Sequence, residues 1–138
     1  MNFYLASTSE HGPELEQVRY KLEHMGHIVV SEWHKPENIR IQQFDKLFGI
    51  YRMGWALKDV RDVKKCDILV HRNPGPGSGK GGSHVEYGMA YTLGKTIVVI
   101  GEPSNVFQYL PGIINFPNWD ELYNYLMDMS ISCSLLKN

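Results

Sequence analysis

The sequence predicts a single α/β domain over residues 1–138, a flavodoxin-like three-layer sandwich around a five-stranded parallel sheet. The length of 138 residues fits one domain with one core. Short apolar segments alternate with segments whose apolar residues recur at helical spacing, as in parallel strands joined by crossover helices. Two of the short segments, 67–71 and 96–101, are almost continuously apolar, as expected for central strands covered on both faces.

The first predicted strand covers residues 3–6 and leads into a helix. Pro13 fits the first turn of that helix, where its missing N–H costs nothing, and Gly26 is well placed to end it. The second predicted strand, residues 27–33, is rich in β-branched residues. The apolar residues of the helix are spaced three or four apart and form one stripe for the sheet: Leu15, Val18, Leu22 and Met25.

The rest of the chain continues the alternation. Residues 34–43 predict an irregular crossover or a flap, and the polar tail from Ser130 is expected to fray. The other predicted elements, in order, are a helix over 52–65, a strand over 67–71, a glycine-rich loop, a helix over 83–93, a strand over 96–101, a short helix over 105–110, a strand over 113–116 and a helix over 119–129.

The strand rhythm suggests the order 2-1-3-4-5, in which the direction of travel reverses between strands 1 and 3. Ligands bind at such a switch point, beyond the carboxyl ends of the strands. The two loops that meet there are residues 7–9, beginning with Ser7, and residues 73–83. We therefore expect both loops to line a ligand site.

The loop from Asn73 to Ser83 carries five glycines. Glycine permits positive φ and lets a ligand approach the main chain, and N–H groups that lead into a helix form an anion site. Gly81 and Gly82 would supply such amides, and Lys80, Ser83 and His84 would add donors. The alternative is an exposed, flexible surface loop. A Walker loop does not fit. Gly77, Gly79 and Gly82 satisfy G-x-G-x-x-G, with Glu102 20 residues beyond Gly82, but the distance from the preceding strand argues against a dinucleotide fingerprint.

Glu86 follows this loop in the first turn of the next predicted helix. The helix dipole favours an ionised carboxyl there, which suits a nucleophile better than a general acid. Ser83 and Glu86 also fit the S-x-x-E capping box, which would make the glutamate a helix cap. The sequence leaves both roles open.

Three patches share a further pattern. The first contains Tyr4, on the first predicted strand. In the second, residues 59–68, Asp59 stands eight residues ahead of the aspartate that opens the third strand. The third, residues 82–90, reads Gly-Ser-His-Val-Glu-Tyr-Gly-Met-Ala. In order and spacing these patches resemble the nucleoside 2-deoxyribosyltransferase family, which includes the 2'-deoxynucleoside 5'-phosphate N-hydrolases.

The resemblance implies a role for each patch. Glu86 would attack the anomeric carbon, Tyr4 would position that glutamate, and Asp59 would contact the sugar or the base. Without the resemblance, a tyrosine on a buried strand is usually core and an aspartate among charged neighbours is usually solvated. The transferases carry an aspartate where this chain has Lys80, whereas the hydrolases have a serine there and bind the 5'-phosphate in this loop. Lys80 therefore favours a nucleotide substrate.

Composition limits the partners. A net charge of −1 and a pI near 6.6 argue against polymeric nucleic acid or a membrane as partner. The two cysteines and six histidines show no metal-ligand spacing, so we expect neither a metal nor a cofactor. The absence of a signal-peptide pattern and of a long apolar segment predicts a cytoplasmic protein. The resemblance further implies a homo-oligomer, dimer or higher.

Two main classes of function remain open from the sequence, beside a third option, a dinucleotide-dependent enzyme. One is an enzyme that cleaves or exchanges the base of a nucleoside or nucleoside 5'-monophosphate. The other is a non-catalytic nucleotide-binding or sensing module of the same fold. The base, the choice between ribose and deoxyribose, and the choice between hydrolysis and transfer are not encoded in these motifs.

Overall fold

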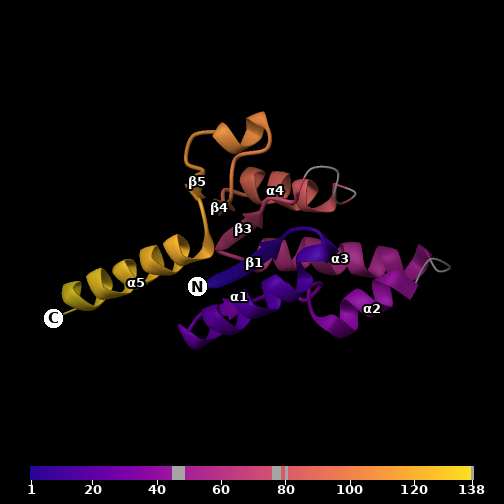
Figure 1. Ribbon diagram of the computed structural model, residues 1–138, viewed down its shortest axis with the longest axis horizontal. Coiled ribbons are helices and arrows are strands. Elements are labelled where there is room, and N and C mark those ends of the chain that lie inside the picture. Colours follow the sequence, from indigo (N-terminus) through magenta and orange to yellow (C-terminus); the bar gives the residue numbers. More distant parts are fainter. Residues whose placement is uncertain (45–48, 76–78, 80, 138) are drawn as a thin grey trace.

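A computed structural model describes residues 1–44, 49–75, 79 and 81–137 of the chain. Five parallel strands form one sheet in the order β2-β1-β3-β4-β5, with helices on both sides (Figure 1). This confirms the predicted flavodoxin-like class and strand order. The strands are β1 (Asn2–Ala6), β2 (Ile28–Val29), β3 (Ile68–Arg72), β4 (Thr96–Ile100) and β5 (Ile114–Phe116).

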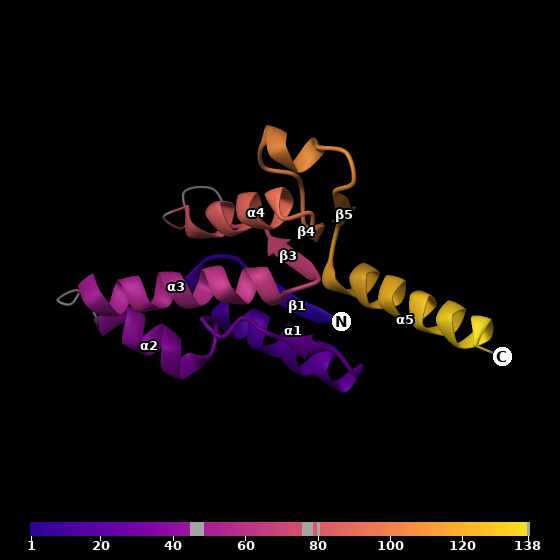
Figure 2. The same ribbon diagram turned by 180° about the vertical axis from the view of Figure 1, so that it is seen from behind.

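Helices connect successive strands. The α-helices are α1 (Gly12–His24), α2 (Pro36–Phe44), α3 (Gly49–Lys65), α4 (Gly82–Thr92) and α5 (Trp119–Leu136), and two 3-10 turns are η1 (Ser9–His11) and η2 (Val106–Tyr109). Both views place α3 beside α4, the η2 connection at one extremity and the C-terminal half of α5 away from the sheet (Figures 1 and 2). No helix in the described part of the chain is both long and apolar enough to cross a bilayer.

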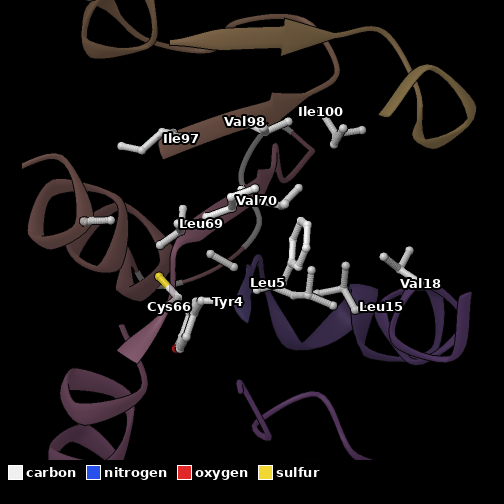
Figure 3. Close-up of a cluster of buried hydrophobic side chains, with 14 of the residues drawn as sticks. Tyr4, Leu5, Leu15, Val18, Cys66, Leu69, Val70, Ile97, Val98 and Ile100 are labelled. Atoms are coloured by element: carbon white, nitrogen blue, oxygen red, sulfur yellow. The ribbon is translucent and has the colours of Figure 1, made fainter. Parts of the chain in front are cut away.

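The central strands separate two apolar layers because neighbouring side chains point to opposite faces. Figure 3 shows Leu5 directed toward Leu15 and Val18 of α1, whereas Tyr4 points to the other side, near Cys66 at the end of α3. All five side chains are buried. The face of the sheet that carries Tyr4 is therefore the one that α3 and α4 cover.

The second strand is shorter than the sequence predicts. A strand over residues 27–33 was expected, but β2 contains only Ile28 and Val29. Beyond it, side chains replace the backbone ladder of β1: Ser31 Oγ accepts from Leu5 N at 3.0 Å, and Trp33 Nε1 donates to Leu5 O at 2.7 Å. The edge of β1 is thus satisfied without a longer strand.

Two further expectations were wrong. Residues 34–43 are not an irregular crossover, because Pro36 begins α2, and Ile39 packs so closely on Gly12 of α1 that a Cβ on the glycine would displace the end of the Ile39 side chain. The tail from Ser130 does not fray, because α5 continues to Leu136. The chain has neither glycine nor proline between Trp119 and its end, so nothing in the sequence interrupts the helix.

Candidate active site

Three polar side chains from different elements meet on the α3 and α4 face of the sheet. Tyr4 lies on β1, Asp59 on α3 and Glu86 on α4. Tyr4 Oη, Asp59 Oδ1 and Glu86 Oε2 are all buried, and none has a hydrogen-bond partner in the described part of the chain. Each of the three groups perturbs the ionisation of another. The structure therefore brings the three predicted catalytic residues together.

The two carboxyls resist ionisation. Burial, and to a smaller extent the nearby Asp59 carboxylate, raises the pKa of Glu86 to about 8. Burial and the negative charge of Asp62 raise the pKa of Asp59 to about 6. The Tyr4 hydroxyl is close enough to lower both pKa values, although it makes no well-formed hydrogen bond to either carboxyl. Between these pKa values, the pair holds one proton.

This finding corrects the expected charge of Glu86. The helix dipole was expected to keep the carboxyl ionised, but the cost of removing it from water is larger, so the pKa rises. The capping box is also wrong, because the N-cap of α4 is Gly81 and no side chain makes a cap hydrogen bond. Ser83 lies within the helix. Glu86 is consequently not a helix cap.

An ion-pair cluster lies next to Asp59. Lys58 Nζ contacts Asp62 Oδ2 at 2.6 Å and Glu32 Oε2 at 3.1 Å. Asp62 is buried, and its charge reinforces the raised pKa of Asp59, while the Lys58 cation acts in the opposite direction. Lys58 therefore neutralises the outer carboxylates and leaves Asp59 as the group facing Tyr4.

The two predicted switch-point loops do meet. Gly79 approaches Thr8 so closely that a Cβ on the glycine would lie 2.4 Å from Thr8 Cγ2, and its φ of +82° is one that favours glycine. Ser7 Oγ donates to the carbonyl of Arg72 at 2.9 Å and contacts His11 Nδ1 at 2.8 Å. The Ser7 hydroxyl thus joins the end of β1 to the end of β3, and its role as a ligand contact stays a prediction.

The remaining predicted binding residues lie at the start of α4. Gly81 has a φ of +89° and caps the helix, Gly82 begins it, and both are exposed. Ser83 is buried, whereas His84 is exposed. The first N–H groups of a helix have no intrahelical acceptor and suit an anion. Lys80 lies outside the described residues.

Sequence reasoning missed a polar network at the end of β3. His71 and Asn73 are buried there, and Asn73 exchanges two hydrogen bonds with Gln108 of η2, at 2.7 and 3.0 Å. One sequence feature could have indicated this network: His71 is a polar residue that ends an otherwise apolar central strand at the switch point. Among the described residues, no group of three or more His, Cys, Asp or Glu side chains is placed to hold a metal ion.

Comparison with known proteins gives the fold. No protein-family model and no curated protein matches this chain. A solved structure does: the CMP N-glycosidase BcmB from Clostridium botulinum superposes with a TM-score of 0.60 at 19% identity, over 93% of this chain and 99% of that chain. The protein is therefore an α/β protein that shares the fold of a nucleotide N-glycosidase.

Proposed function

We propose that this protein is an enzyme that cleaves the N-glycosidic bond of a nucleoside 5'-monophosphate or nucleoside, with Glu86 as nucleophile. The observation that carries the proposal is the pair of half-buried residues Glu86 and Asp59 near the Tyr4 hydroxyl, each with one buried carboxyl oxygen that no described residue satisfies. Unsatisfied buried carboxyls with raised pKa values are costly for folding and are typical of functional sites. Shared fold with a CMP N-glycosidase supports the choice of bond.

The singly protonated pair suits this reaction. Departure of a base from C1' builds positive charge on the sugar, which a close carboxylate stabilises or traps. The positive charge that develops at C1' favours the ionised form of Glu86. The proton of Glu86 therefore passes to the carboxylate of Asp59, the group of the pair with the lower pKa. A Glu86 oxygen then bonds C1', the C1'–N bond breaks with its electrons on the base, and Asp59 protonates that nitrogen.

The second half of the reaction releases the sugar. Water attacks C1', the Glu86–C1' bond breaks with its electrons on the carboxylate, and the proton of the water returns to Asp59. The products are the free base and the sugar 5'-phosphate. If a second base attacks in place of water, the same intermediate gives base exchange. Hydrolysis is our first choice because the neighbour in fold is an N-glycosidase.

A nucleotide is the proposed substrate rather than a free nucleoside. The start of α4 offers helical N–H groups and the buried Ser83 beside the exposed His84, next to a loop that presses on Thr8. A 5'-phosphate bound there would place the sugar toward Glu86, one helical turn further on. Lys80, from the same loop, would add a positive charge.

The test is release of free base from a panel of ribo- and deoxyribonucleoside 5'-monophosphates, followed by chromatography. We expect base from at least one nucleotide, and loss of more than about a thousandfold in kcat with Glu86→Gln, since nucleophile removal is of that order. Glu121→Gln is the matched control, because Glu121 also lies near a helix start but is exposed. Intact substrates with folded wild-type protein would exclude the enzyme. Ligand-induced stabilisation without turnover would indicate the binding module instead.

We also propose that the protein assembles with itself. The η2 turn exposes three apolar side chains, with 63–76% of each accessible: Val106, Phe107 and Tyr109. The turn is nevertheless attached to the protein by the buried Gln108 and by Tyr87 Oη, which donates to Phe107 O at 2.7 Å. A rigid exposed apolar turn favours an interface. Light scattering on the purified protein measures the mass directly, and a strict monomer would contradict this proposal.

A further inference from the structure

His71 is a fully buried histidine that the proposed chemistry does not use. In the register of β1 and β3, Tyr4 pairs with Leu69 and Ala6 pairs with His71. Paired residues in a sheet point to the same face, and residues two apart on a strand do so as well. Tyr4 and His71 therefore project from the same face, and His71 lies closer to the carboxyl ends of the strands.

The neighbours of His71 place it against the first turns of α4, the helix that carries Glu86. Its ring centroid lies 5.2 Å from that of His84 and 5.6 Å from that of Tyr87. These two residues flank Glu86 in the first turns of α4. The imidazole is thus held between the sheet and the helix that carries the proposed nucleophile.

Asn73 determines which nitrogen of His71 carries the proton. The Asn73 amide Nδ2 donates to the carbonyl of Glu102, so the amide orientation is fixed and Oδ1 is an acceptor. His71 Nδ1 lies 3.2 Å from this Oδ1. Two acceptors do not approach each other at a buried site without a proton between them. Nδ1 therefore carries the proton and donates to Asn73.

Gln108 makes a longer, competing contact to His71 Nδ1. Its Oε1 accepts from Ser104 N at 2.8 Å, which makes Nε2 the donor of its own bond to Asn73 Oδ1 at 2.7 Å. The same Nε2 is 3.4 Å from His71 Nδ1, a longer contact than the one to Asn73. In the opposite tautomer, the lone pair of His71 Nδ1 would face the lone pairs of Asn73 Oδ1. The proton on His71 Nε2 would then be buried without an acceptor, which is costly.

The other ring nitrogen is consequently a free acceptor. His71 Nε2 is buried and has no hydrogen-bond partner among the residues that the structure describes. Burial and the neighbouring His84 lower the pKa of His71 to about 4, so the ring is neutral near pH 7. A neutral Nδ1–H imidazole offers at Nε2 a lone pair and no proton.

We propose that His71 Nε2 accepts a hydrogen bond from an uncharged N–H or O–H group of the bound substrate and thereby sets the specificity of the site. This inference rests on the proposed function, because it assumes a nucleotide beside Glu86. A lone pair at this position repels phosphate and carbonyl oxygens. The group that meets His71 is therefore an exocyclic amine of the base or a hydroxyl of the sugar.

Matched substrates distinguish these two sources. CMP carries an exocyclic amine on its base where UMP carries a carbonyl. CMP also differs from its 2'-deoxy analogue, and from its 3'-deoxy analogue, by one hydroxyl of the sugar. We expect wild-type kcat/KM to favour the donor-bearing member of one pair by at least about tenfold, the value of one buried hydrogen bond. His71→Phe should abolish that preference, whereas His71→Gln, which keeps an acceptor, should retain part of it. His27→Phe is the control, because His27 Nδ1 is also buried without a partner among the described residues but lies at the other end of the sheet.

A second measurement needs no substitution at His71. Nitrogen NMR of the Glu86→Gln protein should show the His71 proton on Nδ1, and CMP should shift the Nε2 resonance as it gains a hydrogen bond.

The outcomes separate this inference from the proposed function. If the wild type cleaves nucleotides but discriminates no pair, or if His71→Phe folds and keeps the preference, His71 does not read the substrate. A proton on Nε2 in the free protein would also overturn the inference. If the wild type neither cleaves nor binds any nucleotide, both proposals fail.

Discussion

Replacing Glu86 with glutamine should change how stability depends on pH. In the folded protein, burial raises the pKa of Glu86 from 4.5 to about 8. A group whose pKa is raised by folding contributes its full stability below the unfolded pKa and loses it as pH rises through the folded one. The unfolding free energy of the wild type should therefore fall as pH rises from the unfolded pKa to the folded one. Glutamine resembles the protonated acid and cannot ionise, so the Glu86→Gln protein should not show this fall.

The size of the effect follows from the two pKa values. A rise from 4.5 to about 8 corresponds to about 5 kcal/mol of unfolding free energy, and entry of water beside the ionised carboxyl reduces it. We expect Glu86→Gln to gain about 2 to 5 kcal/mol over the wild type between about pH 4 and about pH 9, measured by urea unfolding. Glu121→Gln should follow the wild type throughout. Parallel curves for the wild type and Glu86→Gln would show that Glu86 is solvated, and would refute the buried pair.

Three further substitutions test other parts of the structure. Tyr4→Phe removes a buried hydroxyl without a formed hydrogen bond, so stability should change by less than about 1 kcal/mol, while the pH optimum of cleavage moves upward because both carboxyl pKa values rise. Gly79→Ala forces a Cβ against Thr8 at a positive φ and should weaken nucleotide binding about tenfold, by titration calorimetry. Gln108→Ala breaks the reciprocal amide pair at the end of β3 and should cost about 2 to 4 kcal/mol by urea unfolding.

Each of these has a result that would count against it. An unchanged pH profile in Tyr4→Phe would separate the hydroxyl from the carboxyls. Gly54→Ala is the control for Gly79, since a Cβ on Gly54 of α3 meets no atom of the described residues within 4 Å, and equal behaviour of the two variants would contradict the loop contact. A Gln108→Ala protein as stable as the wild type would show that solvent replaces the amide pair.

The strand order and the meeting of the switch-point loops could be predicted because both follow from short-range patterns. Continuous apolar segments identify β3 and β4 without any knowledge of long-range contacts. In a parallel sheet the carboxyl ends of the strands lie at the same edge, so the loops that follow them come together. The length of β2 could not be predicted, because it depends on Ser31 and Trp33 satisfying the backbone of Leu5 across the fold. Propensity does not encode such contacts.

The sequence predicted which residues form the candidate site but not the ionisation state of its carboxyls. Glu86 was found by its place after the glycine-rich loop, and Asp59 and Tyr4 only by resemblance to a family. Asp59 stands among charged neighbours in the sequence, and only packing of α3 against β1 and α4 reveals its buried oxygen. The raised pKa of Glu86 is likewise a consequence of burial. The tautomer of His71 depends on amides from three separate segments, which no local pattern reports.

A covalent bond between Glu86 and the substrate sugar is the most direct sign of the proposed reaction. Rapid acid quench of the wild type within the first turnover, before water releases the sugar, followed by intact-protein and peptide mass spectrometry, should reveal a sugar phosphate attached to Glu86, with free base released in equal amount. The Glu86→Gln protein should show neither. Base release by the wild type without an adduct, together with activity in Glu86→Gln, would contradict the nucleophilic role of Glu86.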